Sequence, residues 1–69
     1  MGEEEDEINR LAHQVLDRGY SAVAAQNELK LKKDGTFNRI YKKEKLISAR
    51  IETIQAERAN LLNQRHIVG

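Results

Sequence analysis

The chain has 69 residues, of which 39% are hydrophobic and 33% are charged, and its formal net charge is +1. A chain of this length forms at most one small domain and buries only about 60% of its unfolded surface, so its core needs a supplement. Because it contains no Cys, disulfides and thiolate metal sites are excluded, and we expect assembly to provide that supplement.

The first predicted helix spans about residues 4–18. Its apolar residues recur at the i, i+3, i+4, i+7 spacing of one helix face; they are Ile8, Leu11, Ala12, Val15 and Leu16. The acidic run from Glu3 to Glu7 precedes this face, where carboxylates stabilise the positive end of the helix dipole. Gly19 then suits the residue that ends a helix.

The second predicted helix spans about residues 21–32 and opens at Ser21, a favourable N-cap residue. It is short and rich in Ala, so we expect it to depend on its neighbours for its helicity. Asp34-Gly35 comes next as a turn signal.

The third predicted helix is long, spanning about residues 36–65, and leaves 66–69 as a tail. Its apolar residues keep a heptad-like rhythm, which defines an interaction stripe of Ile40, Ile47, Ile51, Ile54 and Leu61. Glu44, Arg58 and Arg65 share this seam, and a parallel dimer would set each charge against its own copy. We therefore favour antiparallel packing, or docking of the first two helices.

These elements predict an all-α fold, in which two short N-terminal helices pack on one long C-terminal helix as a helical hairpin or small bundle. We expect a single domain over residues 1–69, and an oligomer. A second strip on the long helix widens the expected buried face; it consists of Leu46, Ala49, Thr53 and Ala56.

Basic residues crowd the middle of the chain, where they could neutralise phosphates. The candidate nucleic-acid contacts are Lys30, Lys32, Lys33, Asn38, Arg39, Lys42 and Lys43. The alternative is a solvated face around a core of Phe37, Ile40 and Tyr41. Residues 21–43, with Val23-Ala24-Ala25 and then 36–43, resemble the helix-turn-helix of small phage and transposon regulators. That resemblance implies a recognition helix over 36–43, although the connecting turn is longer than the usual three or four residues.

Motifs for catalysis and cofactors were not found in the sequence. His13 and His66 are the only histidines and do not form a zinc pattern. Neither Ser21 nor Ser48 lies in a nucleophile elbow, and there is no glycine-rich phosphate loop. We expect no enzyme activity, no cofactor and no metal. No apolar run approaches the about 20 residues of a membrane span, and the acidic start is unlike a secretory signal, so we expect a soluble cytoplasmic protein.

The favoured function is a non-enzymatic helical protein-protein interaction module, acting through the stripe on the long helix toward itself or a helical partner. Arg50, Glu52, Glu57 and Arg58 would set the register at the rim of that contact. The alternative is a small dimeric nucleic-acid-binding regulator that uses the basic 30–45 region. A small regulator or inhibitor of another protein is a third interpretation, which the sequence does not separate from the first.

Overall fold

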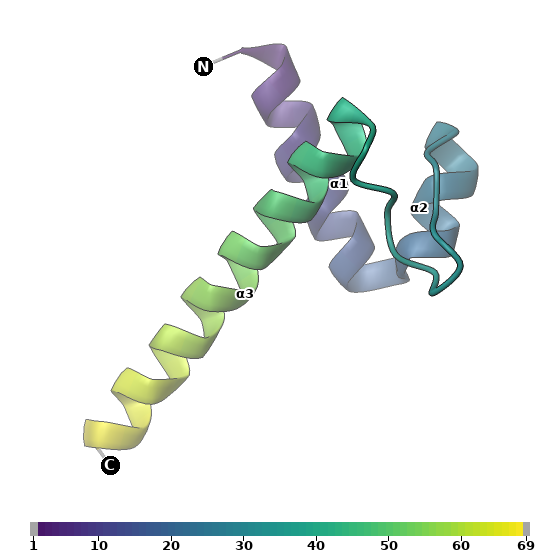
Figure 1. Cartoon of the computed structure of the whole chain (residues 1–69). Helices are drawn as coiled ribbons and strands as arrows, with labels where there is room; N and C mark the ends of the chain where they lie inside the picture. The colour runs from purple at the N-terminus through teal and green to yellow at the C-terminus, as the bar shows by residue number, and fades with distance from the viewer. Residues whose placement is uncertain (1, 69) are drawn as a thin grey trace.

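The computed structural model describes the backbone of residues 2–68 and the side chains of residues 2–62. It is all-α, as predicted, with three helices in this range: α1 (Glu3–Arg18), α2 (Tyr20–Asn27) and α3 (Lys42–Val68). Helix α1 packs against both other helices. Helix α3 runs far past α1 and gives the molecule an elongated outline of 44 × 31 × 20 Å (Figure 1).

Helix α1 forms as its sequence pattern predicts. Its buried face consists of Ile8, Leu11, Ala12 and Val15, its first turn is acidic, and its last turn ends in Arg18. Gly19 stops the helix with φ 97°, and its N–H donates to the carbonyl of Val15 at 2.8 Å. Because a side chain at this φ is strained, Gly19 is what allows α2 to begin only one residue later.

Helix α2 is shorter than the predicted span of 21–32, because it ends at Asn27. Glu28 adopts the left-handed conformation, with φ 56° and ψ 42°, and Leu29 N–H donates back to the carbonyl of Ala24 at 3.0 Å. Val23 and Ala24 are the residues of α2 that are buried. Among the described residues, α2 packs against α1 and not against α3. The predicted small bundle of two short helices and one long helix is confirmed, with α1 as the helix that packs against both others.

The connection between α2 and α3 folds into a small hairpin where the sequence predicted helix. Leu31 pairs with Phe37 in an antiparallel bridge. Asn38 N–H donates to the carbonyl of Lys30 at 2.8 Å, and Lys32 N–H donates to that of Thr36 at 2.7 Å. Gly35 closes the turn with φ 87°. We use the term hairpin for residues 30–38 hereafter.

Helix α3 consequently begins at Lys42, and not at about residue 36. Once Phe37 is paired in the hairpin, the Asn38 side chain accepts the N–H of Ile40 at 3.2 Å, and this local turn competes with helix. At the start of α3, Lys45 N–H donates to the carbonyl of Tyr41 at 2.9 Å. At the other end α3 continues to Val68, beyond the predicted limit of 65. The side chains of Arg65 and His66 lie outside the described residues.

The core lies between α1 and α3 and continues beneath α2 and the hairpin. Phe37 closes the hairpin side of this core, 1% exposed, with its ring edge-to-face against Tyr20 at a centroid distance of 4.9 Å. Ile47, Ile51 and Ile54 of α3 face the buried side of α1 in the same cluster. Within the described part of the chain, no helix is both long enough and apolar enough to cross a bilayer.

Candidate functional site

The predicted interaction stripe is divided by the fold into buried and exposed members. Ile47, Ile51 and Ile54 are only 0%, 3% and 8% exposed, because α1 covers them with its own apolar face. Ile40 is 81% exposed and lies in the connection, outside α3. Leu61 is 61% exposed on α3. The middle of the stripe is therefore used to fold the chain, and Leu61 is the one member that lies exposed on the long helix.

Beyond Ile54, α3 projects past the part of α1 that covers it, and α1 borders it across a groove through Asn9 and His13. We call residues 55–62 the overhang; every one of them is exposed. Leu61 and Leu62 stand side by side in the sequence at 61% and 63% exposure. In Figure 1 this part of α3 extends away from both other helices.

A groove runs along the overhang at the point where α1 and α3 separate. Its α3 wall is the continuous face of Ile54, Glu57, Arg58 and Leu61, together with Arg50 one turn earlier. Its α1 wall consists of Asn9 and His13, which are exposed. The spacing of 54, 57, 58 and 61 is i, i+3, i+4, i+7, so these four side chains share one side of the helix.

The second strip lies on the outside of the molecule, contrary to the prediction that it widens the buried face. Leu46 is 37% exposed, and Ala49, Thr53 and Ala56 are all exposed. Leu46, Ala49 and Thr53 line a shallow groove between α3 and the start of α1, with Ile8 at its floor and Glu4, Glu5, Lys42 and Arg50 around it. The reason is geometric, since among the described helices it is α1 that packs on α3, and it covers one face.

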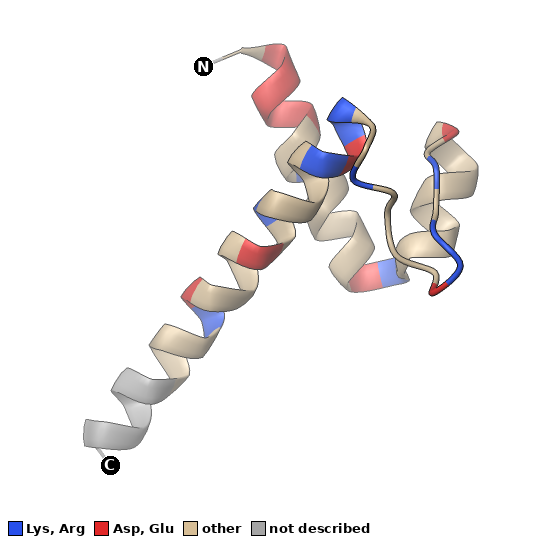
Figure 2. Cartoon of the chain, in the orientation of Figure 1, with Lys and Arg blue, Asp and Glu red and all other residues tan. Residues whose placement is uncertain are grey.

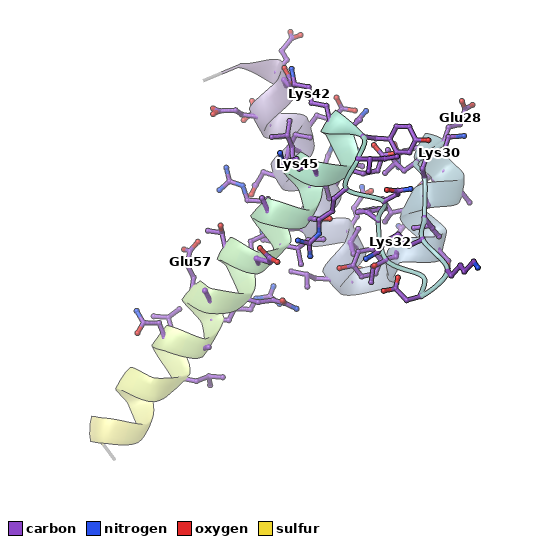
Figure 3. All side chains as sticks on the ribbon, viewed as in Figure 1. Glu28, Lys30, Lys32, Lys42, Lys45 and Glu57 are labelled. Atoms are coloured by element: carbon purple, nitrogen blue, oxygen red, sulfur yellow. The ribbon has the colours of Figure 1, made fainter. Side chains whose placement is uncertain are left out.

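The basic residues do not form one patch. Figure 3 shows Lys42 and Lys45 at the start of α3, whereas Lys30 and Lys32 lie beside α2. The acidic first turns of α1 border the start of α3 (Figure 2), where Glu4 and Glu7 line the same groove as Lys42 and Lys43. The Lys43 ammonium donates to Glu7 at 3.0 Å. Acidic neighbours therefore offset the positive charge at this end.

The remaining candidate phosphate contacts are partly engaged within the chain. The guanidinium of Arg39 reaches Glu52 at 3.4 Å, and Lys32 reaches Asp34 at 3.7 Å at the tip of the hairpin. Lys30 and Lys33 are exposed on the hairpin. The recognition helix expected over 36–43 is not formed, since α3 begins only at Lys42. The helix-turn-helix interpretation of that segment is therefore wrong.

The tip of the hairpin is organised by one carboxylate. Asp34 accepts both the N–H of Thr36 at 2.9 Å and its hydroxyl at 2.7 Å. These two hydrogen bonds, and then the charge of Lys32, lower the pKa of Asp34 below its ordinary value. The turn signal in the sequence was thus correct, although the turn leads into a strand-like segment and not into a helix.

Glu44 has a role that the sequence analysis missed. It is 5% exposed, and its carboxylate accepts the backbone N–H of Lys30 at 2.8 Å. This hydrogen bond ties the start of the hairpin to the first turn of α3. In the sequence Glu44 looked like a polar interruption of the apolar seam, and no local signal points to a partner fourteen residues earlier.

No three His, Asp or Glu side chains of the described residues lie close enough together to hold a metal ion. A scan of protein-family models and searches of curated proteins and of solved structures found nothing similar to the chain. The overhang, its groove and the hairpin are therefore interpreted from their own chemistry.

Proposed function

We propose that the protein is a non-enzymatic helical interaction module that associates with a helical surface through the overhang. The observation that carries this proposal is that residues 55–62 project past α1 with Leu61 and Leu62 uncovered. The stripe retains its proposed role in association only where α1 leaves it exposed.

The physical support is that no element of the described residues covers the overhang, whose residues are all exposed. Short stretches of helix are marginal in water, and most helical stability in proteins comes from packing an apolar face. Covering Leu61 and Leu62 with a partner helix would contribute about 1.5–3 kcal/mol for each side chain that becomes fully buried. A partner thus stabilises the overhang and is held by it.

The surroundings of the overhang favour binding over catalysis. Its groove is lined mainly by aliphatic and charged side chains, and the single imidazole there, His13, is exposed. Catalytic side chains need shelter from water in order to have perturbed pKa values. Arg50, Glu57 and Arg58 instead frame the apolar residues, an arrangement that sets the orientation of a partner.

Sedimentation equilibrium tests the proposal. We expect the wild-type protein to sediment above the 7.9 kDa of one chain, and a Leu61→Asp/Leu62→Asp variant to sediment as one folded chain. The matched control is Ser21→Asp/Ala22→Asp, which adds the same two carboxylates at exposed positions in the first turn of α2, away from the overhang and its groove, and leaves association intact. Equal masses for wild type and the Leu variant would contradict the proposal.

A second candidate function, nucleic-acid binding, is favoured by one observation. The hairpin carries exposed Lys30 and Lys33, and Figure 3 shows Lys30 beside α2. Helix α2 has no charged residue, and its exposed side chains include Ser21 and Gln26. A basic hairpin next to an uncharged helix can hold phosphates while short polar side chains approach base edges.

Salt dependence tests this second candidate. We expect Lys30→Ala/Lys33→Ala to weaken duplex binding and to reduce the slope of affinity against salt by about two, since each phosphate contact contributes about one. Lys42→Ala/Lys45→Ala, which removes the same charge at the other end of the molecule, serves as the control. Absence of any binding at about 50 mM salt would remove this candidate.

A further inference from the structure

The α3 wall of the overhang groove has a symmetric order of side chains, and Ile54 at its inner end is only 8% exposed. Reading along α3, the four residues are aliphatic, acidic, basic and aliphatic: Ile54, Glu57, Arg58 and Leu61. This order is self-complementary in an antiparallel pair of identical helices. Each aliphatic residue of one helix then meets an aliphatic residue of the other, and each acidic residue meets a basic one. The midpoint of this arrangement lies between Glu57 and Arg58.

We propose that the occupant of the groove is a second copy of this chain, packed antiparallel about a two-fold axis that passes between Glu57 and Arg58. This inference rests on the proposed function and names the partner. Leu61 of one copy contacts the edge of Ile54 that α1 of the other copy leaves open to the groove. Glu57 of one copy faces Arg58 of the other, and the two-fold repeats both contacts. An isologous contact of this kind closes on itself and yields a dimer.

The antiparallel direction follows from charge. In a parallel pair each residue lies beside its own copy, so Arg58 would face Arg58 and Glu57 would face Glu57, and like charges at close range oppose association. In the antiparallel pair both charges meet an opposite charge. Figure 3 shows Glu57 on the projecting part of α3, far from the hairpin and its lysines, so no basic residue of the hairpin competes for it.

The α1 wall of the groove supports the same occupant. Asn9 and His13 border the groove opposite Arg58 and Leu61 and are exposed. Helix α3 of the second copy would therefore lie between α1 and α3 of the first copy. Helix α1 of the second copy would then cover the overhang of the first copy. Each overhang thus gains the cover that its own chain does not supply, and the dimer continues the core beyond Ile54.

Cysteine crosslinking tests the direction, because the native sequence contains no Cys. A mixture of Ile54→Cys and Leu61→Cys proteins is expected to form a mixed disulfide. Leu61→Cys alone is expected not to crosslink, since the two copies of position 61 would lie about 10 Å apart along the axis, beyond the span of a disulfide. In a parallel pair the single variant would crosslink efficiently and the mixture would show no preference for the mixed species.

Charge reversal is a second measurement that does not disturb the buried Ile54. Glu57→Arg and Arg58→Glu are each expected to weaken the dimer at least about tenfold, because each creates two like-charge contacts. An equimolar mixture of the two variants is expected to recover the wild-type affinity as a heterodimer. In that heterodimer the two arginines of the Glu57→Arg chain face the two glutamates of the Arg58→Glu chain, so every contact again joins opposite charges.

The outcomes separate this inference from the proposed function. Efficient self-crosslinking of Leu61→Cys, or unchanged affinity of both single charge variants, overturns the antiparallel dimer while association through the overhang stands. A wild-type protein that stays at the mass of one chain up to about 1 mM, a Kd corresponding to only about 4 kcal/mol, overturns this inference and the proposed function together.

Discussion

Two isoleucines that the sequence treats as equivalent are expected to differ sharply when each is replaced by Ala. Ile51 is 3% exposed within the core cluster, whereas Ile40 is 81% exposed in the connection. Ile→Ala removes three carbon groups worth about 0.8 kcal/mol each when buried, and the cavity left behind brings the cost at position 51 to about 3–4 kcal/mol. At position 40 the cost should stay within about 0.5 kcal/mol.

Urea denaturation followed by circular dichroism at 222 nm measures both variants. The core of so small a chain supplies at most about 3–5 kcal/mol, so Ile51→Ala is expected to be largely unfolded at 37 °C, while Ile40→Ala melts like wild type. Equal losses of stability in the two variants would refute the division of the stripe into core and surface. A stable Ile51→Ala would show that α1 does not hold α3 through this face.

Three further substitutions probe the connection. Glu28→Gly should raise the free energy of unfolding by about 0.5–1 kcal/mol, because Gly adopts the left-handed conformation of residue 28 without strain. Glu28→Ala is the control and should bring no such gain. Equal urea midpoints for the Gly and Ala variants would contradict this reasoning. Glu44→Ala should cost about 1–3 kcal/mol, since it leaves the Lys30 N–H without its acceptor, whereas Glu44→Gln retains an acceptor oxygen and should lose less in the same urea titration. The pKa of Asp34, followed by NMR, should lie below its ordinary value and rise toward it in Thr36→Ala. Because the pKa of Asp34 is lower in the folded state, its contribution to stability is present above the unfolded-state pKa and is lost as the pH falls through the folded-state pKa. A Thr36→Ala variant in which Asp34 titrates as in wild type would contradict the assigned cause.

The sequence predicts the helices where one pattern acts without competition. In α1 the spacing of Ile8, Leu11 and Val15, the acidic first turn and Gly19 all agree, and the helix lies where they place it. The heptad rhythm also identifies Ile47, Ile51 and Ile54 as the buried side of α3.

The sequence fails where long-range pairing overrides local pattern. Phe37 and Ile40 fit the helical rhythm, but Phe37 gains more from burial against Tyr20 and from pairing with Leu31 than from a turn of helix. Ile40 is then left exposed outside α3. Periodicity also does not show how far α1 reaches along α3, so it could not separate the covered isoleucines from the exposed Leu61.

Association through the overhang is tested most directly by amide hydrogen exchange along α3 at protein concentrations from about 1 µM to about 1 mM, a range that spans binding free energies of about 8 to 4 kcal/mol. The amides of residues 55–62 should become protected as the concentration rises, while those of 47–54, already covered by α1, should stay equally protected throughout. Exchange in the overhang that is fast and identical at every concentration would contradict the proposal that a second copy covers it.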